Sequence, residues 1–68
     1  MTIFDFKDCF EKQIEVLSTD GKIYRGKLTG FEDKEDTSSG EDEIELYVGD
    51  CFIGIDVPHI KSFKLISD

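Results

Sequence analysis

The chain has 68 residues, of which 38% are hydrophobic, and a formal net charge of −8. A chain of this length forms one domain and buries a smaller share of its surface than a longer chain, so association with further copies would add stability. No segment approaches the roughly 20 apolar residues that a membrane helix needs, and the N-terminus carries acids where a signal peptide carries bases. We therefore expect a soluble, cytoplasmic protein with no membrane partner.

The negative charge is concentrated in one segment. Residues 32–45 contain eight acids and one base, Lys34, whereas the rest of the chain carries eight acids and seven bases. We therefore expect a nearly neutral body with one strongly acidic loop.

The first segment with a helical pattern is residues 2–12. Phe6, Cys9 and Phe10 recur at spacings of three and four, which is typical of an apolar stripe on a short helix, and Thr2 can cap its start. A helix this short does not persist alone, so its stripe is expected to cover one end of another element.

Two runs rich in apolar and β-branched residues follow, at 13–18 and 22–31. Asp20-Gly21 between them supplies the positive φ angles of a tight hairpin turn. Gly26 lies inside the second run, where a sharply bent strand needs a residue without a Cβ.

Residues 33–42 contain no apolar residue, and we expect a solvated loop that is mobile at its Ser-Ser-Gly centre. Alternation at 43–48 predicts a third strand with one packed face. The nearly all-apolar run 51–57 predicts a fourth strand covered on both faces. A one-turn connector at Pro58-His59 leads to a last strand at 60–66.

These elements predict one all-β domain over residues 1–68, with an N-terminal helix at 2–12 and a strongly bent five-stranded sheet at 13–66 that forms a small closed or nearly closed barrel. Cys9 and Cys51 lack metal-ligand spacing and are expected to be reduced, partly buried thiols. The expected core consists of Phe6, Phe10, Ile14, Val16, Ile23, Leu28, Phe31, Ile44, Leu46, Val48, Ile53, Ile55, Ile60, Phe63 and Leu65.

The segment 14–32 resembles the first sequence motif of the Sm-like (LSm) family. The matching positions are Ile14, Val16, Asp20, Gly21, Tyr24, Gly26, Leu28, Gly30, Phe31 and, where the family usually has Asp, Glu32. The ending VPHIKSFKLI is similar to the endings of small bacterial Sm-like proteins. The resemblance implies subunits that join into rings, with the third-to-fourth hairpin of one copy pairing with the last strand of the next.

The usual activity of the Sm-like family is to bind single-stranded RNA at the pore of the ring. The bases are held there by three residues: a loop residue that stacks on the base, a loop Asn that reads the base edge, and the Arg of an Arg-Gly pair. Here the first two correspond at best to Glu35 and Asp36, and Ile53 precedes Gly54 where the Arg would stand. Carboxylates would repel phosphate, so uridine binding in the pore is expected to fail.

Two other surfaces are candidate binding sites. A modest basic and aromatic patch for RNA would consist of Tyr24, Arg25, Lys27, Lys61 and Lys64. The acidic loop could meet a basic protein through Asp33, Glu35, Asp36, Glu41 and Asp42. An ordinary solvent-exposed face and a solubilising insertion are the respective alternatives.

The sequence contains little that indicates a metal site or a catalytic site. An EF-hand beginning at Asp33 fails, because Ser38 stands where Gly is needed and Ile44 where Glu is needed, which leaves only weak binding of divalent cations. His59 is the only histidine and has no second nitrogen ligand or nucleophile. We therefore expect no enzyme, no metal and no cofactor. The sequence predicts a ring-forming, RNA-binding Sm-like module of non-standard type or, alternatively, a scaffold that binds a basic partner.

Overall fold

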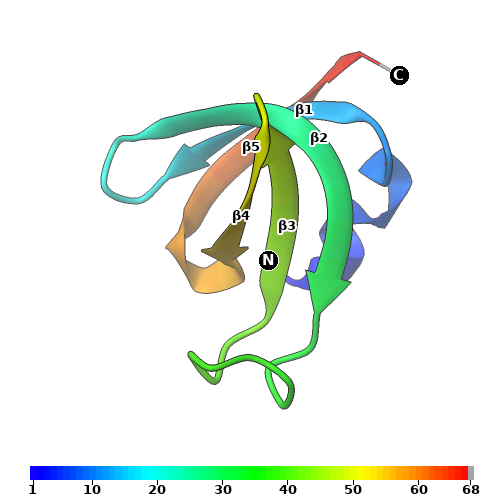
Figure 1. The fold of residues 1–68 in the computed structure, drawn as a ribbon. Helices are drawn as coiled ribbons and strands as arrows, with labels where there is room; N and C mark the ends of the chain where they lie inside the picture. The colour runs from blue at the N-terminus through cyan, green and yellow to red at the C-terminus, as the bar shows by residue number, and fades with distance from the viewer. Residues whose placement is uncertain (68) are drawn as a thin grey trace.

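The computed structural model describes residues 1–67 as two short 3₁₀ helices and five strands (Figure 1). In chain order the elements are η1 (Ile3–Cys9), β1 (Gln13–Ser18), β2 (Ile23–Glu32), β3 (Glu43–Val48), β4 (Cys51–Asp56), η2 (Val57–His59) and β5 (Ile60–Ser67). The strands form one antiparallel sheet in the order β4-β3-β2-β1-β5, so β4 and β5 are its edges. The all-β class with an N-terminal helical segment is confirmed. No helix in this part of the chain is long and apolar enough to cross a membrane.

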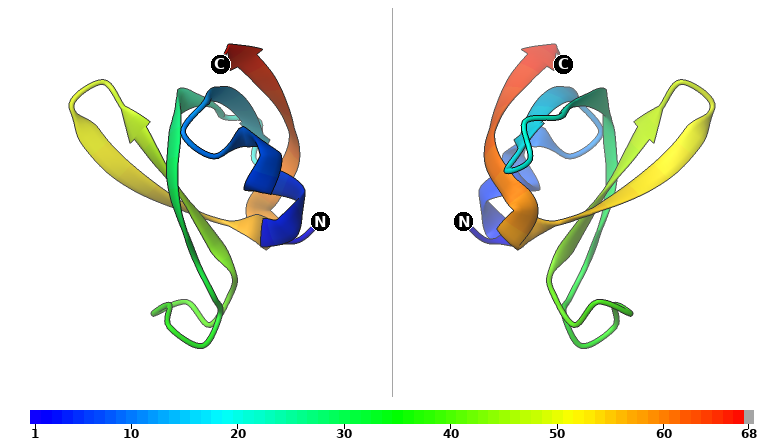
Figure 2. Two further views of the ribbon diagram at one scale, coloured as in Figure 1. Left: turned by 90° about the vertical axis from the view of Figure 1, so that its right-hand side faces the viewer. Right: turned by 90° about the vertical axis from the view of Figure 1, so that its left-hand side faces the viewer.

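The bend expected at Gly26 is present and has a steric cause. A Cβ on Gly26 would lie 2.5 Å from the carbonyl oxygen of Tyr47 and 2.9 Å from a methyl carbon of Val48. The β2–β3 register shifts between Leu28 and Gly30, which marks a bulge that increases the curvature. As a result β2 arches over the molecule, and the β3–β4 hairpin projects away from β1, β5 and η1 (Figure 2).

The β1–β2 turn was predicted correctly in place but not in detail. Gly21 has a positive φ of 89°, whereas Asp20 does not. The Asp20 carboxylate instead accepts the N–H of Lys22 at 3.1 Å, as an Asx-type contact within the turn.

Thr2 caps η1, as expected. Its hydroxyl accepts the N–H of Phe4 at 3.3 Å, and the Asp5 carboxylate accepts the N–H of Thr2 at 2.7 Å. This reciprocal arrangement is a capping box, and it satisfies backbone donors that a helix start leaves unpaired.

η1 covers one end of the sheet but is shorter than the expected 2–12. The ring of Phe6 is fully buried and stacks on that of Phe63 in β5, with centroids 4.1 Å apart. The helix ends at Cys9, and Glu11 then takes a positive φ of 66° and donates its N–H to the carbonyl of Leu28. The chain thereby enters the sheet instead of continuing the helix.

The core lies between η1 and the inner face of the bent sheet. Its fully buried side chains are those of Phe6, Ile14, Val16, Leu28, Ile44 and Leu46. Three expected core residues, Phe10, Ile23 and Leu65, are exposed instead. Phe10 follows the helix and meets Phe31 only at the rim, Ile23 faces outward at the start of β2, and Leu65 lies on the edge strand β5.

The expectation that the fourth strand is covered on both faces is wrong. β4 is an edge strand, and Phe52 within it is 62% exposed. Cys9 is buried but Cys51 is exposed, so the thiols are not both partly buried. The apolar run has no neighbouring strand on one side among the described residues.

Candidate functional site

A row of charged side chains crosses the outer face of β2, β1 and β5. Arg25 and Lys64 lie opposite Glu15 on its two sides. The Arg25 Nε donates to a Glu15 oxygen at 2.6 Å, and the Lys64 Nζ lies 3.3 Å from the other oxygen. The hydrogen bond from Arg25, reinforced by Lys64, lowers the pKa of Glu15. Two of the predicted RNA-binding residues therefore share one carboxylate, which offsets part of their charge.

The other predicted RNA-binding residues are placed differently. Lys27 is exposed two positions from Arg25 on the same face of β2, opposite Gln13. Lys61 is exposed near the start of β5, at a shift in the β1–β5 register. Tyr24 faces inward opposite Val16 and packs against the core. The predicted aromatic residue is thus separated from the basic face, because successive strand residues point to opposite sides.

The acidic loop is held by short contacts of its own. The Asp42 carboxylate accepts the N–H of Lys34 at 2.9 Å, and the Asp33 carboxylate accepts that of Glu35 at 3.2 Å. The hydroxyl of Thr37 donates to the carbonyl of Glu41 at 2.8 Å. Glu35, Asp36 and Glu41 are exposed to solvent.

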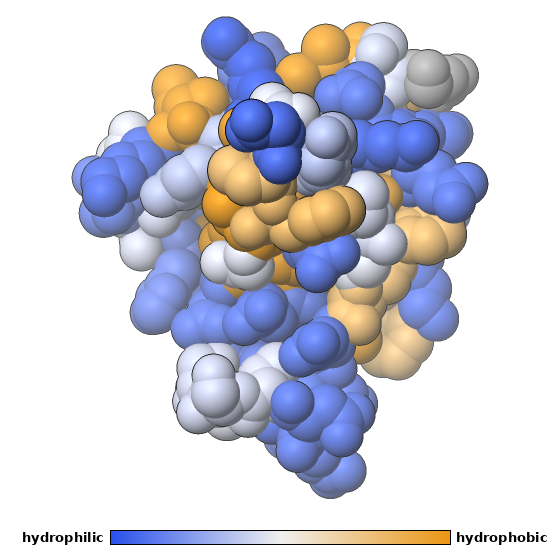
Figure 3. Space-filling model, viewed as in Figure 1, coloured by the Kyte–Doolittle hydropathy of each residue, from blue (hydrophilic) through white to orange (hydrophobic). Residues whose placement is uncertain are grey.

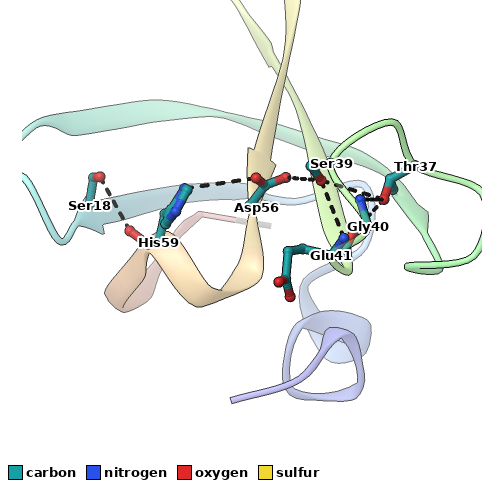
Figure 4. Close-up of polar contacts among 7 residues, drawn as sticks. All are labelled: Ser18, Thr37, Ser39, Gly40, Glu41, Asp56 and His59. Atoms are coloured by element: carbon teal, nitrogen blue, oxygen red, sulfur yellow. Dashed lines mark hydrogen bonds and ion pairs between the residues drawn. The ribbon is translucent and has the colours of Figure 1, made fainter.

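One contact ties this loop to the end of β4. The hydroxyl of Ser39 donates to an Asp56 oxygen at 3.0 Å, and the other Asp56 oxygen lies 3.8 Å from the Nδ1 of His59 (Figure 4). The hydroxyl of Ser18 donates to the backbone carbonyl of His59, at 3.2 Å, and not to its ring. The geometry is therefore that of a loop anchor, without the hydroxyl-to-imidazole contact that an activated serine needs.

A second acidic feature, not anticipated from the sequence, lies on the sheet itself. Glu32, Glu43 and Asp56 stand opposite one another on β2, β3 and β4. Burial of its carboxyl, and then the charges of Asp56 and Glu32, raise the pKa of Glu43. Like charges directly opposite on neighbouring strands are destabilising, so this carboxylate row favours a cation beside it.

The carboxylate row borders an open cavity of about 550 Å³ between β4 and the β1–β2 turn. Its lining includes Tyr24, Ile53, Ile55, Glu43, Asp56 and His59. Among residues 1–67 no group of three or more histidine, cysteine or acidic side chains is arranged to hold a metal ion.

The two sheet edges are the third candidate surface. Both expose large apolar side chains: Phe52 on β4, and Leu65 and Ile66 on β5. Figure 3 shows an apolar area in the middle of the view, where β4 crosses the front in Figure 1, above the hydrophilic loop. The two edges also differ in charge. The β3–β4 hairpin, residues 43–56, contains acids and no base, whereas β5, residues 60–67, contains Lys61 and Lys64 and no acid.

Comparison with known proteins gives no match: no protein-family model, curated protein or solved structure is significantly similar to this chain. The likeness to Sm-like proteins therefore rests on the sequence motifs alone.

Proposed function

We propose that this chain is a self-assembling, Sm-like module whose copies join through the edges of their sheets. One observation carries the proposal: within residues 1–67, β4 and β5 each have a neighbouring strand on one side only, and both expose large apolar side chains. An unprotected edge is a template for pairing with another chain, and soluble proteins usually cover or charge it. The simplest cover for both edges is a second copy at each.

Joining β4 of one copy to β5 of the next is a head-to-tail contact. Such contacts close into a ring when the rotation between copies allows it. The opposite charges of the two edges favour this pairing over β4 with β4 or β5 with β5. A ring is also what the resemblance to the Sm-like family implies.

For the ligand of this assembly, the charges favour a basic protein segment. The acidic loop exposes Glu35, Asp36 and Glu41 to solvent, and the contact between Ser39 and Asp56 holds this loop beside the end of β4. In an assembly of several copies, these fields would add and attract a cationic partner while repelling phosphate. The module would then act as a scaffold.

RNA on the outer face of β2, β1 and β5 is the second candidate. Arg25, Lys27 and Lys64 lie on this face, away from the acidic loop. Glu15 offsets part of their charge, and Tyr24 points to the other side. This face therefore favours weak, strongly salt-dependent binding without base stacking by Tyr24.

Assembly is tested by a matched pair of exposed phenylalanines. Phe52 in β4 is 62% exposed and Phe4 in η1 is 67% exposed, so neither substitution to Lys removes a core side chain. We expect Phe52→Lys to lower the sedimentation coefficient to that of a monomer and Phe4→Lys to leave the assembly intact. Assembly that is insensitive to Phe52→Lys would refute pairing through β4.

The ligand is tested by titrating a Lys/Arg-rich peptide and uridine-rich RNA separately. The peptide should bind the wild type and lose affinity in the triple variant Glu35→Gln, Asp36→Asn, Glu41→Gln. RNA binding that survives this triple variant but is lost in Arg25→Gln, Lys27→Gln would place RNA first and reject the scaffold proposal.

A further inference from the structure

The geometry points to a specific contact between copies: Lys64 on β5 of one copy lies opposite Gly54 on β4 of the next and reaches the Glu43 carboxylate. This inference rests on the proposed self-assembly and names its register and its ion pair.

Among the ion pairs of residues 1–67, none joins a lysine or arginine to the carboxylate row of Glu32, Glu43 and Asp56. Glu43 has Glu32 on one side and Asp56 on the other, and no base lies anywhere in residues 43–56. The nearby His59 lies 3.8 Å from Asp56 and is largely exposed. A positive group from outside the chain would therefore relieve repulsion that the isolated copy cannot relieve.

The β5 edge carries a suitable group on the matching face. Lys64 stands opposite Glu15 on the outer face of the sheet, and its side chain is 71% exposed. Glu43 and Asp56 of the carboxylate row also face outward, because the residues next to them along their strands, Ile44 and Ile55, face the core. Edge pairing that keeps the inner faces together therefore brings Lys64 to the acidic side of β4.

One antiparallel register matches both faces at once. With Gly54 opposite Lys64, the inward-facing Ile53 meets Leu65. The same register places Ile55 opposite Phe63 and, on the outer face, Phe52 opposite Ile66. A shift by two residues that sets Lys64 opposite Asp56 leaves Phe52 beyond the end of β5, with its apolar surface uncovered.

The absence of a side chain at Gly54 leaves room for Lys64 of the next copy to approach Glu43. A Cβ built on Gly54 would overlap the carboxylate of Glu43, so this carboxylate lies directly over the glycine backbone. A long side chain opposite Gly54 meets no side chain at that position, so it can extend over the glycine to the Glu43 carboxylate, which β3 places there.

The ion pair between Lys64 and Glu43 is tested by exchanging the charges of the two residues. We expect Lys64→Glu and Glu43→Lys each to weaken association by about tenfold or more, and the double variant to restore most of the loss, as in a double-mutant cycle. Lys27→Glu is the control, because it makes the same charge change on a central strand and should alter association by less than about twofold. Circular dichroism of each variant confirms that the monomer is folded.

The register is tested independently by oxidative cross-linking. Residues directly opposite each other on paired strands lie within the span of a disulfide. In a Cys51→Ser background, Ile53→Cys combined with Leu65→Cys should give covalent multimers with copper phenanthroline as oxidant. Ile53→Cys combined with Ser62→Cys should not.

The outcomes separate the two levels of the argument. A wild-type protein that is monomeric at every concentration would overturn both the self-assembly and this contact. An assembly that ignores Lys64→Glu, or that the double variant fails to restore, would overturn the contact and leave self-assembly standing. Cross-linking of the control pair alone would overturn the register.

Discussion

The close approach of β2 to β3 at Gly26 gives a quantitative prediction for Gly26→Ala. The new Cβ would lie 2.5 Å from the Tyr47 carbonyl oxygen and 3.0 Å from its carbonyl carbon. Both are backbone atoms, so the strands must separate. Overpacking of this kind costs about 1–3 kcal/mol, and the loss of glycine freedom in the unfolded chain returns about 0.4–1 kcal/mol. We expect a net loss of about 1–2 kcal/mol.

Gly30→Ala in the same strand is the matched control. Its Cβ would meet only side-chain atoms of Glu45, at 3.7 and 3.8 Å, which is ordinary van der Waals contact. For a domain of this size the loss at Gly26 corresponds to a fall in Tm of about 5–15 °C, while Gly30→Ala should not lower Tm. Thermal unfolding of both variants is compared at one protein concentration, because assembly makes Tm depend on concentration. Equal Tm values for the two variants would refute the steric explanation of the bend.

Three further predictions concern single acidic residues. Glu11 holds a positive φ of 66°, so Glu11→Gly should leave the free energy of unfolding unchanged or raise it by up to about 1 kcal/mol, whereas Glu11→Val should lower it in urea titrations. The pKa of Glu15 is lowered, chiefly by Arg25, so its stabilisation is present above the ordinary value of 4.5 and is lost as the pH falls through the folded pKa; Glu15→Gln should remove this part of the pH dependence of Tm. The pKa of Glu43 is raised by burial and by Asp56, so its ionised form destabilises the protomer at neutral pH. A non-associating Glu43→Gln, Phe52→Lys variant should therefore unfold at higher temperature than Phe52→Lys at pH 7, and this gain should vanish as the pH falls through the raised pKa. A gain that grows on acidification would contradict the assignment.

The strands could be predicted from the sequence because their patterns are local. Alternation alone located Glu43–Val48, and the requirement for a residue without a Cβ located the bend at Gly26. The same alternation rule separates Tyr24 from Arg25, so the basic patch could have been drawn without its aromatic member. η1 ends early because Phe10 leaves the helical backbone conformation, with ψ at 131°, and Glu11 then takes a positive φ, and residue type reveals neither.

The candidate site was less accessible to sequence reasoning because it depends on register. The row of Glu32, Glu43 and Asp56 exists only because two hairpins and a bulge align three strands. Likewise, the apolar run Cys51–Asp56 indicates a strand, but it does not show that this strand lies at an edge of the sheet with Phe52 exposed. In this structure the chain itself leaves one side of that strand uncovered.

Amide hydrogen exchange in β4 and β5 tests the central claim most directly, since it reports whether the edge backbone groups are paired. At protein concentrations where copies associate, self-assembly predicts slow exchange at alternate amides of both edge strands, comparable to that of β1. Dilution or Phe52→Lys should restore fast exchange at the edges. Edge amides that exchange at the same rapid rate at every concentration, while β1 and β2 remain protected, would contradict the proposal that copies join through these strands.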